Sequence, residues 1–328
     1  MGSRQTLLFA VAALCLVSSS VWAATPAEQG PYGIGVLYDD AVDASRGREI
    51  DLLILYPATT DAVEAPAAGC PLILFNHGFM LWGELYRSYG EQLASQGFVV
   101  ALPTYTLSMV AVSHTTLAAD ARFVIDHCLA LATDVRSPLF GLVDASAIGA
   151  AGHSFGGKLA LLEAATDPRV RAIAALDPVD GGGPVINDPV LYPSVTPELM
   201  PEIQAPLLFV GAELGGLSDR LIPCAPATDN YQRFYEAANS PAIEITQIGA
   251  GHGQYADPGA ALILAACAPG TASAEWVRTS AAAYLTAFFL GRLTGDAAAL
   301  DWLDARLAED EAQGRIAVRQ KWAAGRAG

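Results

Sequence analysis

A serine flanked by glycines is the clearest chemical signal in this sequence. Ser154 stands in Gly-His-Ser-Phe-Gly-Gly at 152–157, after a run of small apolar residues at 148–152 and before a helical pattern that begins at Lys158. A Gly-x-Ser-x-Gly pattern between a strand and a helix is typical of a sharp turn that lifts the serine hydroxyl above the edge of a sheet. We therefore predict that Ser154 is the nucleophile of an acyl-transfer reaction.

The base for such a serine is expected later in the chain. Serine is a weak nucleophile at its own pKa, so it needs a base to take its proton and an acid to fix the tautomer of that base. His252 follows the last strand pattern and lies between Gly251 and Gly253. His153 adjoins the serine but points elsewhere on a tight turn, and His127 lies in a helical pattern. The sequence therefore favours His252 as the base.

The acid has several candidates after two later strands. Asp177 ends the strand that follows the nucleophile helix, whereas Glu213 and Asp219 follow the next strand. The order serine, acid, histidine is satisfied at both places. Asp180 and Asp188 lie in a glycine-rich loop and are interpreted as turn residues. Spacing alone leaves the choice of acid open.

Two backbone N–H groups should stabilise the oxyanion that forms during acyl transfer. One is expected from Phe155, the residue after the nucleophile, and the other from the loop at 77–80, where we predict the Phe79 N–H as the donor. Met80 and Trp82 of the same loop are predicted to line the substrate pocket, with core packing as the alternative for Trp82.

Apolar runs and helical periods indicate the elements that position these residues. Short continuous apolar runs indicate strands buried on both faces of a parallel sheet, and strands that alternate with helices imply right-handed crossovers. The predicted fold is α/β, of the α/β-hydrolase type, with a mostly parallel central sheet flanked by helices. We expect the hydrolase domain over 24–295 and a C-terminal helical extension over 296–328, in which 296–322 form an amphipathic helix. The strands are predicted at 48–56, 71–76, 98–102, 148–152, 170–176, 206–211 and 243–248, and the other helices at 86–96, 117–132, 158–165 and 274–290.

The composition limits the classes of partner. The chain has 52% apolar residues and a formal net charge of −16, from 18 basic and 34 acidic residues. This acidity disfavours nucleic acid and anionic membrane surfaces, because both attract clustered Lys and Arg. The expected partner is a hydrophobic small-molecule ester, without stable membrane insertion. No Cys or His pair has the spacing of metal ligands, so we expect neither a metal nor another cofactor.

The first 23 residues have the pattern of a secretory signal peptide. Arg4 gives a short positive region, Leu7 to Val17 form an apolar run, and Val21-Trp22-Ala23 offers a cleavage site. The apolar run is shorter than a bilayer-spanning helix requires. We therefore predict a signal peptide at 1–23 and a secreted or periplasmic location.

Cysteine usage agrees with export. Of the 5 cysteines, Cys15 lies in the signal segment, and an even number remains, which permits disulfides in an oxidising compartment. Cys224 and Cys267 lie in loop-like segments on either side of His252, and we predict that they pair. Cys128 falls on an apolar helical stripe and is interpreted as a small buried residue.

Several sequence blocks follow one another in a specific order. They are Phe-Asn-His-Gly-Phe at 75–79, Gly-His-Ser-Phe-Gly-Gly-Lys at 152–158, Leu-Asp-Pro-Val-Asp-Gly at 176–181, Pro-Cys-Ala-Pro at 223–226 and Gly-His-Gly at 251–253. Together they resemble the chlorophyllase family, from about residue 30 to residue 292. The serine turn and the Leu-Asp block also resemble platelet-activating-factor acetylhydrolases. Both resemblances imply an acid on the strand after the nucleophile helix, which is Asp177 with Asp219 in reserve, and hydrolysis of a carboxylic ester.

One departure from the family bears on the substrate. Plant chlorophyllases commonly carry Arg at the position of Phe155, so the resemblance implies ester hydrolysis and leaves open chlorophyll, lipids, short-chain esters and polyesters. The apolar segment 104–116 would suit a long alkyl chain or form a packed surface loop. The alternatives are a lipase, a phospholipid acetylhydrolase or a polyester hydrolase of the same fold, and a non-catalytic hydrolase-like binding protein. A thiol-dependent dienelactone-type hydrolase would need Cys at position 154.

Overall fold

Nine strands form one sheet in the computed structural model, which describes residues 24–58, 66, 69–105, 113–181, 188–217, 223–239 and 241–322. The strand order is β1-β2-β4-β3-β5-β6-β7-β8-β9. The strands are β1 (Gly33–Asp43), β2 (Arg48–Ala58), β3 (Cys70–Asn76), β4 (Val99–Thr104), β5 (Val143–His153), β6 (Val170–Leu176), β7 (Leu207–Ala212), β8 (Ala242–Gln247) and β9 (Ile316–Lys321).

The centre of the sheet is parallel and its edges are antiparallel. Every neighbouring pair from β4 through β3, β5, β6 and β7 to β8 is parallel, whereas β1 with β2, β2 with β4, and β8 with β9 are antiparallel. The carboxyl ends of β3, β5, β6, β7 and β8 therefore meet at one edge. Loops from different parts of the chain converge there, as is usual for ligand sites in this architecture.

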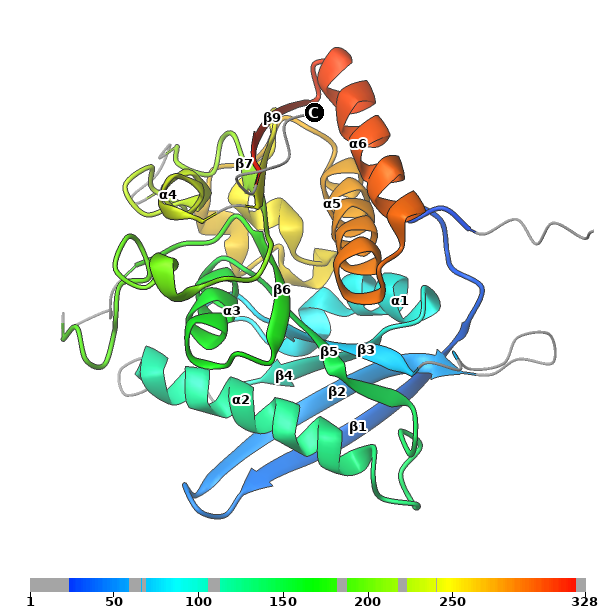
Figure 1. The fold of residues 1–328 in the computed structure, drawn as a ribbon. Helices are drawn as coiled ribbons and strands as arrows, with labels where there is room; N and C mark the ends of the chain where they lie inside the picture. The colour runs from blue at the N-terminus through cyan, green and yellow to red at the C-terminus, as the bar shows by residue number, and fades with distance from the viewer. Residues whose placement is uncertain are drawn as a thin grey trace, which may run out of the picture.

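Helices cover both faces of the central strands (Figure 1). Side chains alternate along each strand, so Leu72 and Leu74 of β3 belong to one buried cluster and Ile73 and Phe75 to the other. The first cluster includes residues of α2 (His114–Leu131), α3 (Phe155–Thr166) and α4 (Tyr231–Ala237), and the second includes residues of α1 (Arg87–Ser95), α5 (Ala274–Phe289) and α6 (Ala297–Ala312). Burial on both faces explains the continuous apolar runs of these strands. The predicted α/β fold, with a mostly parallel sheet between helices, is confirmed.

Three elements differ from the sequence-based expectations. β1 is an edge strand with exposed apolar side chains such as Val36 and Tyr38, so its pattern does not mark a buried face. α4 is too short for a helical period to be recognised. The predicted helix over 296–322 is wrong in its last part: α6 ends at Ala312, and β9 follows. Arg319 of β9 is bonded to buried Glu244 of β8, a long-range contact that periodicity does not reveal.

Three sequence-based predictions fall on residues outside the described ranges. These are the signal peptide at 1–23, the central part of the apolar segment 104–116 at 106–112, and the reserve acid Asp219.

Candidate active site

Ser154 stands in a sharp turn between β5 and α3. Its φ of 57° and ψ of −123° lie in a backbone region that residues other than glycine rarely occupy. Its N–H donates to the Leu176 carbonyl of β6 (2.9 Å). A Cβ on Gly152 would lie 2.3 Å from the Gly156 carbonyl oxygen, and one on Gly156 would lie 2.1 Å from that of Asn76. The two glycines therefore allow the close packing that presents Ser154 at the carboxyl edge of the sheet.

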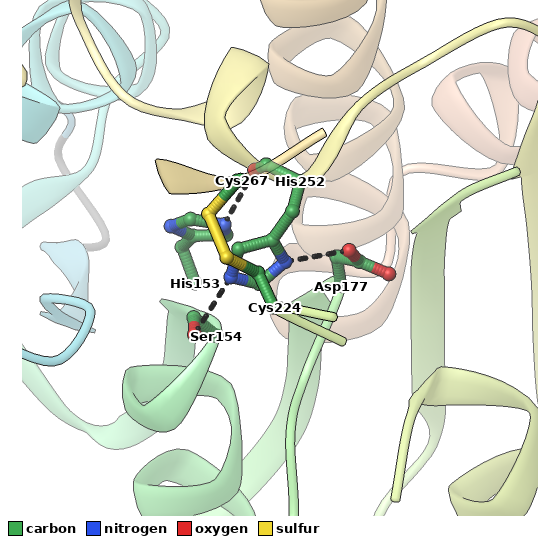
Figure 2. The surroundings of a disulfide bond; sticks show 6 residues. All are labelled: His153, Ser154, Asp177, Cys224, His252 and Cys267. Carbon is green, nitrogen blue, oxygen red and sulfur yellow. Dashed lines mark hydrogen bonds and ion pairs between the residues drawn. A yellow bond between two sulfur atoms is a disulfide. The ribbon is translucent and has the colours of Figure 1, made fainter. Parts of the chain in front are cut away.

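His252 reaches Ser154 from the loop after β8, where it begins a short 3-10 helix, His252–Tyr255. Its Nε2 lies 2.9 Å from Ser154 Oγ, and its Nδ1 lies 2.7 Å from Asp177 Oδ2 (Figure 2). An ionised carboxylate only accepts, so Nδ1 carries the hydrogen and the Nε2 lone pair faces the serine hydroxyl. In this tautomer His252 is oriented to take a proton from Ser154 Oγ.

Main-chain contacts orient the carboxylate of Asp177. The residue follows β6, is fully buried, and has a φ of 39°. Its N–H donates to the Val210 carbonyl (2.6 Å), and its Oδ1 accepts from the Ala212 N–H (3.1 Å) at the end of β7. One carboxylate oxygen is thus held by β7 while the other faces His252.

The other acidic candidates that the structure describes have partners elsewhere. Glu213 Oε2 accepts from the Gly249 N–H (2.8 Å) and so ties the end of β7 to the loop that follows β8. Asp180, predicted as a turn residue, is instead a buried partner of Lys158 at 3.0 Å. Asp188 accepts from the N–H two residues later, as a turn residue does. None of these three described carboxylates contacts the histidine.

The loop after β3 packs against the serine turn. A Cβ on Gly156 would lie 2.6 Å from the His77 carbonyl oxygen, which shows how close the two segments are. Phe79 of this loop precedes Met80, whose φ is 61°. Phe155 is the first residue of α3, where helix geometry leaves the N–H without an intrahelical partner. Neither the Phe79 nor the Phe155 N–H donates to a backbone or side-chain acceptor within the described ranges.

Both the start of α3 and the loop after β3 carry apolar side chains. The Phe155 ring is nearly buried and its centroid lies 4.6 Å from that of His114, which in turn lies 4.9 Å from that of Tyr192. Burial, and secondarily the nearby Lys158 ammonium, lowers the pKa of His114 to about 3. Phe79, Met80 and Trp82 are 44%, 41% and 41% exposed, so Trp82 is not packed in the core.

A disulfide joins the loop after β7 to the loop after His252. Cys224 and Cys267, the pair predicted from the sequence, are bonded across a separation of 43 residues. Figure 2 shows the bridge beside His252 and His153. Among the described residues Cys70 and Cys128 are free and buried, and burial raises the pKa of each thiol to about 12.

Comparison with known proteins identifies the family. The family model described as Chlorophyllase matches residues 40–311, which is most of the chain. The chain belongs to the chlorophyllase family. As a chlorophyllase-family protein it is a hydrolase with the α/β-hydrolase fold, as the sequence blocks suggested. The second resemblance, to platelet-activating-factor acetylhydrolases, stays a prediction.

Plant proteins are among its relatives. The chlorophyllase-family protein is 25% identical to Chlorophyllase-2 of Arabidopsis thaliana over 190 residues, 56% of this chain and 59% of the relative. It is 29% identical to Chlorophyllase-1 of the same plant over 210 residues, 60% of this chain and 63% of the relative. It is 27% identical to the chloroplastic Chlorophyllase-1 of Citrus unshiu over 235 residues, 69% of each chain. The matches to the two Arabidopsis relatives therefore span less than two thirds of their length.

Sequence reasoning missed one polar residue behind the candidate site of this chlorophyllase-family protein. Tyr86 is fully buried, and its hydroxyl lies 2.7 Å from His153 Nδ1. Tyr86 lies in a helical segment before α1, and no local motif links it to the serine turn.

Two further properties concern ligands and membranes. Within the described part of the chain, no three His, Cys, Asp or Glu side chains are grouped in a way that could hold a metal ion. No helix in the same residues is long and apolar enough to cross a bilayer.

Proposed function

We propose that this chlorophyllase-family protein is a serine carboxylesterase with Ser154, His252 and Asp177 as its catalytic triad. The observation that carries the proposal is the continuous hydrogen-bonded chain from Ser154 Oγ through both ring nitrogens of His252 to the Asp177 carboxylate, with contacts of 2.9 and 2.7 Å. Membership of a hydrolase family supports the same conclusion.

The first half of the reaction forms an acyl-enzyme. Ser154 Oγ attacks the ester carbonyl carbon while His252 Nε2 takes the hydroxyl proton. The Phe79 and Phe155 N–H groups donate to the oxyanion, and Asp177 stabilises the imidazolium. When the ester C–O bond breaks, His252 returns the proton to the departing alcohol.

The second half releases the acid. His252 takes a proton from a water molecule, and the resulting hydroxide attacks the carbonyl carbon of the acyl-enzyme. The bond to Ser154 Oγ then breaks, and His252 gives the proton back to the serine. The net reaction consumes one water and yields one carboxylic acid and one alcohol.

The substrate class is a carboxylic ester with a hydrophobic acyl or alcohol part. Phe155 beside Ser154 and the exposed Phe79, Met80 and Trp82 offer apolar surface for such a group. The relatives are named chlorophyllases, so chlorophyll a is the first natural ester to test. A short-chain phospholipid and an aliphatic polyester represent the other substrate classes considered.

Ser154→Ala tests the proposal. We expect turnover of p-nitrophenyl butyrate to fall by about 10⁵-fold or more, to background, because the variant has no nucleophile. Ser146→Ala, which changes an exposed serine on β5, is the matched control and should keep wild-type turnover. Unchanged turnover in Ser154→Ala would rule out this serine as the nucleophile.

A second experiment separates catalysis from binding and identifies the substrate. A fluorophosphonate probe should label Ser154 in the folded protein, and absence of labelling would favour the non-catalytic alternative. Incubation with chlorophyll a, a short-chain phospholipid and an aliphatic polyester, followed by mass spectrometry of the products, then ranks the substrate classes.

We also infer that the chain is exported after removal of residues 1–23. The signal-like pattern of this segment supports export, as does the Cys224–Cys267 disulfide, since such bonds persist in oxidising compartments. Mass spectrometry of the protein isolated from its native cells should find Ala24 at the N-terminus. An intact segment 1–23 on the active protein would contradict this inference.

A further inference from the structure

His153, which is adjacent to the nucleophile, directs its two ring nitrogens to the His252 carbonyl and the Tyr86 hydroxyl and not to Ser154 Oγ. Its ring is fully buried, and the centroids of the His153 and His252 rings lie 4.6 Å apart. His153 Nε2 lies 3.0 Å from the carbonyl oxygen of His252, a contact drawn in Figure 2. On its other side, His153 Nδ1 lies 2.7 Å from the hydroxyl of Tyr86, which also accepts from the Gly78 N–H at 3.2 Å.

The donor in each of these hydrogen bonds follows from the chemistry of the groups. The His252 carbonyl only accepts, so His153 Nε2 carries the hydrogen and Nδ1 of the neutral ring is an acceptor. The Tyr86 hydroxyl therefore donates to Nδ1 and uses its oxygen to accept from Gly78. Burial, and secondarily the neighbouring His252, holds the pKa of His153 well below its usual range, which keeps the ring neutral as this pattern requires.

The chain of hydrogen bonds joins parts of the site that the sheet keeps apart. Gly78 precedes Phe79 in the loop after β3, whereas His252 lies in the loop after β8. Strands β5, β6 and β7 separate β3 from β8 in the sheet. Tyr86 and His153 bridge this distance behind the serine turn, where neither side chain meets solvent.

We propose that Tyr86 and His153 are positioning residues that hold the loop at 77–80, which carries the proposed oxyanion donor Phe79, at a fixed distance from the backbone of His252. This inference rests on the proposed esterase function. The transition state needs the Phe79 N–H and the His252 ring at the same time, so loosening their connection should affect the chemical step more than ground-state binding of the ester. A misplacement of about 1 Å can cost about 100-fold in rate.

Tyr86→Phe and Tyr89→Phe make a matched pair that tests the proposal. The rings of Tyr86 and Tyr89 both lie 5.2 Å from that of Phe75, and both side chains are buried, but within the described part of the chain the Tyr89 hydroxyl has no hydrogen-bond partner. We expect Tyr86→Phe to lower kcat for p-nitrophenyl butyrate by about 10- to 100-fold with KM almost unchanged. Tyr89→Phe should change kcat by less than about twofold, because it removes a group without a partner.

Variants of His153 test the hydrogen bond between His153 and the His252 carbonyl. Gln places an amide donor near the position of Nε2 and can still donate to the His252 carbonyl, whereas Leu of similar size cannot. We expect His153→Gln to keep at least about tenfold more of the wild-type kcat than His153→Leu. The acidic limb of the pH profile of kcat/KM should stay in place in both variants, because the replaced ring is neutral. A shift of that limb would assign His153 an electrostatic role and overturn the positioning role.

The outcomes distinguish this inference from the proposed function. Equal kcat values for Tyr86→Phe and Tyr89→Phe, or a loss in Tyr86→Phe that lies entirely in KM, would overturn the positioning role while Ser154→Ala remained inactive. Full activity in Ser154→Ala would instead remove the esterase proposal itself. Thermal unfolding of each variant, measured alongside, confirms that kcat is compared between folded proteins.

Discussion

Asp177 presents one carboxylate oxygen to His252 while Ala212 holds the other. In Asp177→Asn the side-chain NH₂ can face His252 Nδ1 and stabilise the tautomer whose Nε2 carries the hydrogen. That tautomer cannot accept the Ser154 proton, so we expect kcat to fall by about 10³- to 10⁴-fold. Steady-state hydrolysis of p-nitrophenyl butyrate measures the loss.

Two other acidic side chains serve as controls for Asp177. Asp219 is the reserve acid suggested by the sequence, and Glu213 accepts a hydrogen bond from the Gly249 N–H, which a glutamine oxygen can still do. Asp219→Asn and Glu213→Gln should each cost far less than Asp177→Asn. A larger loss in Asp219→Asn would move the acid to the loop after β7.

Residues of the site can be predicted when neighbouring residues in the sequence mark them. Ser154 and His252 are marked by glycines and by the strands before them, so the sequence suffices to single them out. The choice of Asp177 over Glu213 needed the family resemblance, because either residue follows a strand and only the path of the chain decides which one meets the histidine. Tyr86 is 67 positions before its partner His153 and carries no local signal.

At the scale of elements, the Cys224–Cys267 disulfide ties together two loops that border the site. It closes a loop across 43 positions, and the loop it closes contains β8 and His252. Such a bond typically stabilises a fold by about 2–4 kcal/mol, mainly by restricting the unfolded chain. The double variant Cys224→Ser/Cys267→Ser should therefore have a Tm several degrees below that of the oxidised wild type, as measured by circular dichroism.

Reduction provides the control for this prediction. Dithiothreitol should lower the Tm of the wild-type protein toward that of the double variant and leave the double variant unchanged. An equal Tm for the double variant and the oxidised wild type would show that the bond contributes nothing to stability.

Burial on both faces decides which strands the sequence predicts. Strands β3, β4 and β7 are buried on both faces, and their uninterrupted apolar runs mark them. β9 lies at the edge of the sheet, and its Arg319 and Lys321 side chains bond to β8 and to the end of α4, respectively. Its stability comes from partners about 75 to 86 positions away, so a local pattern read as a continued helix gave the wrong element.

At the scale of the whole molecule, one buried carboxyl couples the stability of the fold to pH. Glu163 of α3 is fully buried, and neither of its carboxyl oxygens has a hydrogen-bond partner among the residues that the structure describes. Burial, and then the neighbouring Asp167 carboxylate, raises the pKa of Glu163 to about 8, although the nearby Asn76 side chain, Arg169 and Arg122 act in the opposite direction. The folded protein therefore keeps a proton on Glu163 at neutral pH that the unfolded chain has released.

This proton sets the sign of the pH dependence. Since the folded pKa lies above the unfolded value of 4.5, the contribution of Glu163 to stability is complete below pH 4.5 and is lost as pH rises toward about 8. Glu163→Gln cannot titrate, so its free energy of unfolding relative to wild type should rise across that window, by up to about 1.4 kcal/mol for each pH unit. Urea unfolding of both proteins at pH 5, 6, 7 and 8 measures the difference, and Glu198→Gln, at an exposed carboxyl, should parallel wild type. Parallel curves for Glu163→Gln and wild type would mean that Glu163 is already ionised in the folded protein, and the buried cluster beneath α3 would then have to accommodate a full negative charge.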